Sequence, residues 1–170
     1  MGDFLNSLEQ MSFSTWVRES SSIWAFPTFL VLHTIGMSVV AGLSAMIDLV
    51  LLGLWPNVPV KPLEKLYPLL WGGFWLNAVT GTVLLIADAS TKLTNWDFYV
   101  KMIFVFAGTW LIYKMRIVVF GDPDLDQKPV TSQMKTLAMA SLACWFLAIT
   151  AGRLLAYLGP VSGLSGVTNK

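Results

Sequence analysis

Four long apolar segments, separated by short polar connections, dominate the chain. They cover residues 22–54, 68–87, 99–120 and 134–158. A helix needs about 20 apolar residues to cross a hydrocarbon core of about 30 Å, so each segment is long enough to span a membrane once. The pattern predicts an all-α protein built as a four-helix transmembrane bundle.

A different pattern precedes the first segment. Between residues 3 and 20, apolar side chains recur at helical spacing opposite acidic and amide side chains, and Trp16 stands beside Arg18. This is typical of an amphipathic helix lying in the headgroup layer. The predicted organisation is an interfacial segment over residues 1–21, the bundle over 22–158, and a flexible Gly/Ser-rich tail over 159–170.

Composition supports a membrane protein and excludes several other classes. Hydrophobic residues make up 55% of the chain and charged residues 12%, against about 25% charged in ordinary soluble domains. The net charge of +1 comes without a basic stripe, which argues against a nucleic-acid partner. Cys144 is the only cysteine, so an internal disulfide, a covalent haem attachment and a cysteine-ligated cluster are excluded. The first 20 residues lack the apolar core of a signal peptide, so we expect the first segment to direct insertion.

His33 is the only histidine and lies near the middle of the first apolar segment. Polar and ionisable side chains at membrane depth usually face a bundle interior, a cavity or a cofactor, and imidazole is a common ligand of haem iron, copper and zinc. Two interpretations are open. His33 is an axial ligand of haem b, or it hydrogen-bonds Asn77, a threonine or a backbone carbonyl and ties two helices together.

Two arginines are placed to accompany a haem at His33. At about 1.5 Å per residue, His33 lies roughly 16 Å below the start of its segment and Arg153 about 8 Å below the same membrane surface. Arginine binds carboxylates bidentately, so Arg153 and Arg18 are expected to hold the propionates. The alternatives are that Arg153 snorkels to the surface and that Arg18 pairs with Glu19. A second axial ligand would be a methionine or a histidine of a neighbouring chain, and an open position is the other option.

Asp48 falls near the far end of the first segment, where a carboxylate is expected to be a cap or a surface group, with a role in proton relay as the alternative. With His33 it would also suit a small channel or transporter. Few polar residues occur along the third and fourth segments, which argues against such a path.

Residues in the first half of the chain resemble a group of small bacterial four-helix membrane proteins of unknown function. The resemblance covers about residues 10–105. It rests on Arg18-Glu19-Ser20, Trp24, Pro27, His33-x-x-Gly36, Gly42 and Asp48-Leu-x-Leu-Leu-Gly53, and it continues into Gly73-Phe74, Thr80-Gly81, Phe98 and Lys101. That group often has an arginine after the Asp-Leu pair, where this chain has Val50. The resemblance implies a bacterial inner (cytoplasmic) membrane and an architecture similar to small b-type cytochrome membrane subunits.

The leading hypothesis is a haem-b-binding electron-transfer subunit that links a quinone pool to a partner redox protein. The alternative is a non-catalytic membrane scaffold or anchor subunit of a larger complex. Both favour a homo-oligomer or a multi-chain assembly. Lysine and arginine are more numerous in the connections after the first and third segments than on the opposite side, so the positive-inside rule places both termini outside the cytoplasm.

Overall fold

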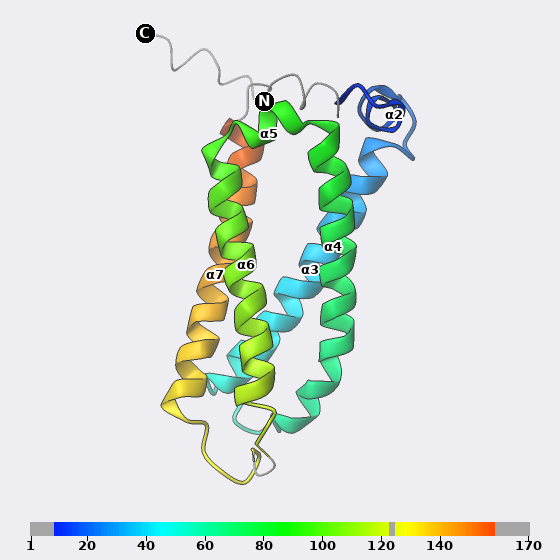
Figure 1. Cartoon of the computed structure of the whole chain (residues 1–170). Coiled ribbons are helices and arrows are strands. Elements are labelled where there is room, and N and C mark those ends of the chain that lie inside the picture. Colours follow the sequence, from blue (N-terminus) through cyan, green and yellow to red (C-terminus); the bar gives the residue numbers. More distant parts are fainter. Residues whose placement is uncertain (1–8, 123–124, 159–170) are drawn as a thin grey trace.

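The computed structural model describes residues 9–122 and 125–158. Within them, four long helices run alternately up and down: α3 (Phe26–Leu51), α4 (Tyr67–Ala87), α6 (Trp96–Val118) and α7 (Ser132–Leu158) (Figure 1). All four are long and apolar enough to cross a membrane. The predicted all-α, four-helix transmembrane bundle is confirmed.

Among the described residues, three short helices lie at the ends of the bundle. Helix α2 (Ser12–Glu19), helix α5 (Ala89–Leu93) and the end of α7 share one end, which we call the upper end (Figure 1). The 3-10 helix η1 (Lys61–Leu66) and the loop between α6 and α7 lie at the other, lower end. The sequence pattern had assigned η1 and α5 to connections. The tail predicted over 159–170 lies outside the described residues.

In the described part of the N-terminal segment, helix α2 docks on the bundle. On α2, Ser14 and Val17 are buried, and the Ser14 hydroxyl donates to the carbonyl of Ile86 at 3.2 Å. Phe13 meets Phe29 of α3 edge to face at 6.2 Å. Residues 1–8 lie outside the described part of the chain, and the location of this segment in the headgroup layer stays a prediction.

Helix α3 begins at Phe26, four residues later than the apolar pattern suggests. Serine hydroxyls hold the preceding residues in turns: Ser20 accepts from the N–H of Ser22, and Ser22 accepts from the N–H of Trp24. Such side-chain bonds to local backbone compete with helix formation. Pro27 then lies in the first turn of the helix, where a missing N–H costs nothing.

The two helical pairs of the bundle pack unequally. Helix α3 packs along α4, α6 packs along α7, and a smaller contact between α3 and α7 joins the pairs, whereas α4 and α6 have little direct contact among the described residues. The α3–α4 crossing is close at Gly36 and Gly73. A Cβ at Gly36 would lie 2.7 Å from the Asn77 nitrogen and 2.9 Å from the Gly73 oxygen, so only glycine fits there.

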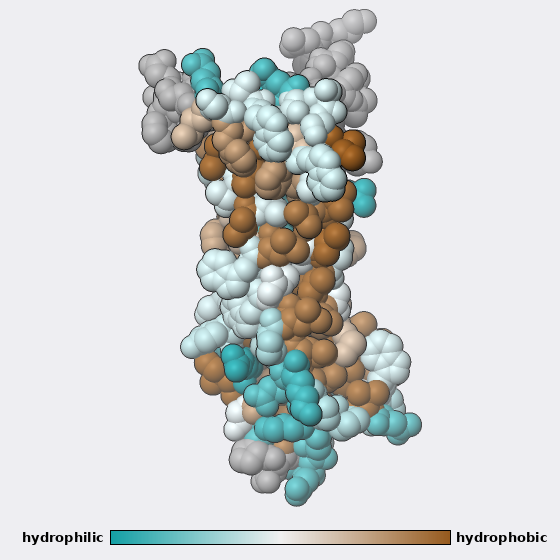
Figure 2. Space-filling model, turned by 90° about the vertical axis from the view of Figure 1, so that its right-hand side faces the viewer, coloured by the Kyte–Doolittle hydropathy of each residue, from teal (hydrophilic) through white to brown (hydrophobic). Residues whose placement is uncertain are grey.

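The main apolar core fills the lower half of the bundle. Its buried members come from the second half of α3, the start of α4, the end of α6 and the first half of α7, and include Ile47, Leu51, Tyr67, Leu70, Ile112, Met115, Leu137 and Ala138. Nearer the upper end, the small Ala148 and Ala151 are buried on α7. Outside, Figure 2 shows hydrophobic side chains over the middle of the visible face and hydrophilic ones at both ends. An apolar outer face between polar ends is what a lipid-exposed bundle requires.

Candidate functional site

His33 lies in the upper half of the bundle, half-buried on α3. It follows Phe26 by seven residues, which places it roughly 10 Å along the helix. The depth of 16 Å expected from the sequence is too large because the helix starts later than the apolar run. Gly81 of α4 lies six residues before that helix ends, and Lys101 of α6 lies five residues after that helix begins, so both are at a similar level.

Hydrogen bonds to α4 fix the imidazole of His33. Its Nδ1 lies 3.0 Å from the carbonyl oxygen of Asn77 and 3.3 Å from the hydroxyl of Thr80. In return, the Asn77 side-chain amide donates to the His33 carbonyl at 2.8 Å. The predicted hydrogen bonding of His33 to Asn77 and a threonine, tying two helices together, is confirmed.

The same contacts define which ring nitrogen of His33 is available. A carbonyl oxygen can only accept a hydrogen bond, so Nδ1 must carry the proton. In the neutral ring Nε2 then holds the lone pair, and within the described residues no hydrogen bond reaches it. Histidines that ligate metals usually donate their other N–H to a carbonyl or carboxylate. The ring is therefore in the tautomer suited to ligation through Nε2.

Gly81 makes the space in which the imidazole lies. A Cβ at Gly81 would lie 2.8 Å from Cε1 of His33 and 3.2 Å from Nδ1. Any side chain at position 81 would push the ring away from Asn77. The position of the imidazole therefore depends on glycine at this place in α4.

Two lysines, which the sequence had not singled out as site residues, are the charged groups that act on His33 electrostatically. Lys101 extends along α7, its Cδ and Cε 3.6 Å from where a Cβ of Gly152 would lie. Lys92 of α5 donates from Nζ to the carbonyl of Leu84 at 2.6 Å. Burial lowers the pKa of the Lys92 ammonium, and Asp88 partly opposes this effect. In the described part of the chain no carboxylate forms an ion pair with Lys101. One feature of the sequence could have identified Lys101 as a site residue: it is a lysine about one turn inside an apolar helix, at the depth of His33.

The two predicted arginines lie elsewhere at the upper end. Arg18 pairs with Glu19 at 2.9 Å and with Glu9 at 3.6 Å, as the ion-pair alternative predicted. Arg153 is exposed on α7, where the snorkelling alternative placed it. Neither is among the groups that act on His33, and their propionate-binding role stays a prediction.

Glu9, the second partner of Arg18, fastens the N-terminal segment to α5. Its carboxylate accepts from both the backbone N–H and the hydroxyl of Ser90, each at 2.6 Å. These bonds, together with Arg18, hold the pKa of Glu9 below its ordinary value of 4.5.

The ligand set limits which metal group the site fits. Over residues 9–122 and 125–158, no three His, Cys, Asp or Glu side chains come together in a group that could hold a metal ion. Zinc needs three or four protein ligands. Haem iron takes its equatorial nitrogens from the porphyrin and needs only axial ligands from protein. A lone, oriented imidazole fits haem and does not fit a zinc centre.

Asp48 does not lie where the sequence suggested. Its side chain is completely buried, so the interpretation as a cap or surface group is wrong. The helix continues to Leu51, and Asp48 lies on the same buried face of it as Ser44, Ile47 and Leu51, inside the lower core.

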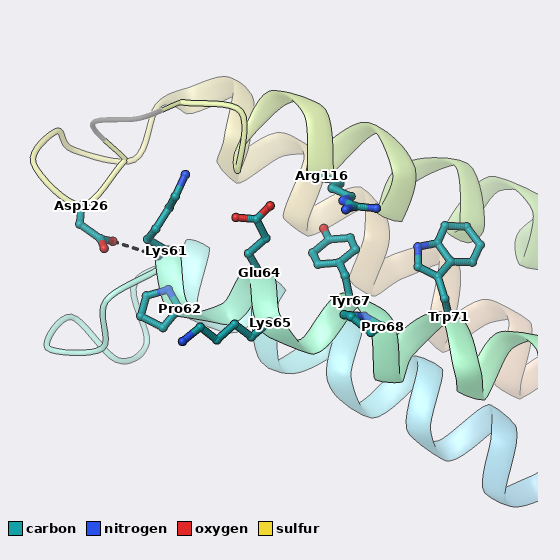
Figure 3. A pocket seen from close by; sticks show the side chains of 9 residues that line it. All are labelled: Lys61, Pro62, Glu64, Lys65, Tyr67, Pro68, Trp71, Arg116 and Asp126. Atoms are coloured by element: carbon teal, nitrogen blue, oxygen red, sulfur yellow. Dashed lines mark hydrogen bonds between the residues drawn. The ribbon is translucent and has the colours of Figure 1, made fainter.

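An open groove of about 620 Å³ lies at the lower end (Figure 3). Several of its charged residues hold the loops together: the Asp126 carboxylate accepts from the backbone N–H of Val60 and Lys61 at 2.7 and 3.1 Å, and Lys61 Nζ donates to the Phe120 carbonyl at 3.1 Å. Figure 3 shows Arg116 over the Tyr67 ring, 5.7 Å from its centre. The groove is lined by Lys61, Pro62, Glu64, Lys65, Tyr67, Pro68, Trp71, Arg116 and Asp126.

Comparison with protein-family models, curated proteins and solved structures gives no match to this chain.

Proposed function

We propose that this chain is a membrane subunit that binds haem b and transfers electrons between a quinone pool and a partner redox protein. His33 is the axial ligand through Nε2. When bound, the haem supplies one-electron redox chemistry, and the chain positions it and tunes its surroundings. The observation that carries the proposal is the 3.0 Å bond from Nδ1 of His33 to the Asn77 carbonyl, which leaves Nε2 as the ligating atom.

The surroundings of His33 support an anionic, bulky occupant. Lys101 and Lys92 bring positive charge close to the level of His33 in the bundle. In the described part of the chain no carboxylate pairs with Lys101, so its charge is available to the negatively charged propionates of a haem. On α7 in this half, the small residues Ala148 and Ala151 are buried. Arg18 and Arg153 belong to the same upper end and keep their proposed role at the propionates.

The location proposed is a bacterial inner membrane with both termini outside the cytoplasm. Six lysine and arginine residues lie toward the lower end, which supports a cytoplasmic lower end by the positive-inside rule: Lys61, Lys65, Lys114, Arg116, Lys128 and Lys135. Two of them pack on aromatic rings, Lys114 on Trp110 and Arg116 on Tyr67, an arrangement suited to a membrane interface. Labelling of single cysteines placed at each end, in intact cells, tests this orientation.

Visible spectra of protein purified in mild detergent test the haem. We expect a b-type spectrum on dithionite reduction of the wild type and its loss in His33→Ala. Asn77→Ala is the matched control, because it removes the side-chain bond to the His33 carbonyl but keeps the backbone carbonyl that orients the ring. Circular dichroism establishes that both variants are folded. Folded wild type that binds no haem when haem is supplied in excess would refute the proposal.

The alternative, a scaffold or anchor subunit in a larger assembly, has its own observation. Gly42 of α3 and Gly72 of α4 are exposed, and a Cβ at either would meet nothing within 4 Å. Small residues on a lipid-facing surface let another helix approach closely. Under this function, Gly42→Leu and Gly72→Leu reduce the oligomer size measured by light scattering in detergent, while His33→Ala leaves it unchanged.

A further inference from the structure

A second polar cluster lies inside the lower half of the bundle, separate from His33. Ser44 and Asp48 are one turn apart on α3, and Ser141 faces them from α7. All three side chains are completely buried. The hydroxyl oxygens of Ser44 and Ser141 are 3.1 Å apart. The cluster therefore joins α3 to α7 at the contact that holds the two helical pairs together.

The carboxylate of Asp48 has no cationic partner there. Both of its oxygens are buried, and the hydroxyls of Ser44 and Ser141 lie near enough to interact with them. In the described part of the chain no lysine or arginine forms an ion pair with Asp48. An isolated carboxylate in an apolar interior is so costly that its charge must be neutralised. Something must supply one positive charge at this position.

The neighbouring helices do not supply that charge. From α4, Tyr67 comes near enough to interact electrostatically with Asp48, but its hydroxyl lies 3.4 Å from the carbonyl of Ile112 on α6. Also from α6, Arg116 lies against the Tyr67 ring and is exposed. From η1, Glu64 adds negative charge near Tyr67, and α7 contributes the uncharged Ser141.

We propose that Asp48, Ser44 and Ser141 form an internal binding site for one monovalent cation, either an alkali-metal ion or a proton. One carboxylate balances one positive charge, whereas a divalent ion would leave an excess charge in the apolar core. Carboxylate and hydroxyl oxygens are the hard ligands that such cations prefer. The two hydroxyls bond to each other in the structure and turn toward the cation when it binds. The site does not depend on the haem proposal, because no residue is shared.

The test uses full-length protein in detergent with Na⁺, K⁺ or choline as the only added cation at constant ionic strength, over a range of pH. Thermal unfolding is measured for the wild type, Asp48→Asn and Glu19→Gln, whose carboxylate is exposed on α2. A ligand that binds the folded state raises its stability. We expect the wild type and Glu19→Gln to gain stability with Na⁺ or with falling pH, relative to Asp48→Asn measured under the same conditions. Subtracting the stability response of Asp48→Asn from that of the wild type removes the contributions of other titratable groups such as Glu9.

Infrared difference spectra between wild type and Asp48→Asn then identify the cation. A protonated carboxyl band that disappears on addition of Na⁺ indicates an alkali-metal site, and a protonated band insensitive to Na⁺ indicates a proton site. Ser141→Ala should weaken the apparent affinity about tenfold, the effect of losing about 1.4 kcal/mol. An ionised Asp48 in choline at every pH, or identical stability responses of wild type and Asp48→Asn, would overturn the proposal. The spectrum of the wild type decides the question even if a variant does not fold.

Discussion

The close crossing of α3 and α4 predicts that Gly36→Ala destabilises the protein strongly. A Cβ at position 36 would lie 2.7, 2.9 and 3.0 Å from three backbone atoms of α4, whereas ordinary contacts begin near 3.4 Å. Backbone atoms cannot rotate away as a flexible side chain does. The two helices must therefore move apart by several tenths of an ångström at Gly36.

This movement has two costs. Overpacking in a well-packed interior typically costs about 1–3 kcal/mol. The same displacement lengthens the reciprocal bonds between His33 and Asn77, now 3.0 and 2.8 Å, and interhelical bonds in membrane proteins contribute roughly 0.6 kcal/mol each. We expect Gly36→Ala to lower the free energy of unfolding by about 2–4 kcal/mol.

The assay is reversible unfolding in mixed micelles, followed by circular dichroism as the fraction of denaturing detergent rises. Gly42→Ala is the matched control, because it lies on the same helix and its added Cβ meets nothing within 4 Å. We expect Gly42→Ala to unfold at the same point as wild type or later. If Gly36→Ala and Gly42→Ala unfold at the same point, the reasoning from backbone contact is wrong.

Three further predictions concern other parts of the chain. Because the pKa of Glu9 is held below 4.5, its contribution to docking the N-terminal segment is complete above pH 4.5 and is lost as the pH falls through the lowered pKa. The rate of amide hydrogen exchange in α2 should rise as the pH falls through that pKa, and Glu9→Gln should raise the same rate at neutral pH. Asp126→Ala removes the acceptor of two backbone N–H groups at the start of η1 and should cost about 1 kcal/mol, as loss of a helix cap does; unchanged unfolding would contradict this. Trp145→Phe removes a buried indole N–H that has no partner, which offsets the lost packing on Gly108, so we expect stability within about 1 kcal/mol of wild type; a loss as large as that expected for Gly36→Ala would show that the indole packing dominates.

The bundle could be predicted from sequence because its signal is long and repeated. Four apolar runs of about 20 residues admit few structures in lipid other than helices. The helix ends were less accurate, since they depend on short-range bonds such as those of Ser20 and Ser22. At the lower end of α3, Gly53 adopts a φ of +89° and closes the helix earlier than the apolar run ends, as glycine does after many helices.

The candidate site could be predicted only in part. His33 and its partner Asn77 were accessible because few polar residues occur at that depth. Lys101 was not identified as a site residue, because a lysine near the start of a membrane helix is also typical of a side chain that snorkels to the surface. Asp48 was placed at the surface because position along a helix does not say which face of the helix packs against its neighbours.

The concentration of the apolar core in the lower half has a consequence for how the molecule moves. Local opening is easiest where few apolar side chains are buried. We therefore expect the lower half to stay fixed, while the upper ends of the α3–α4 and α6–α7 pairs separate from each other at lower free energy. A large planar molecule could therefore reach His33 from the side, between the pairs, without disturbing the core that holds the fold together.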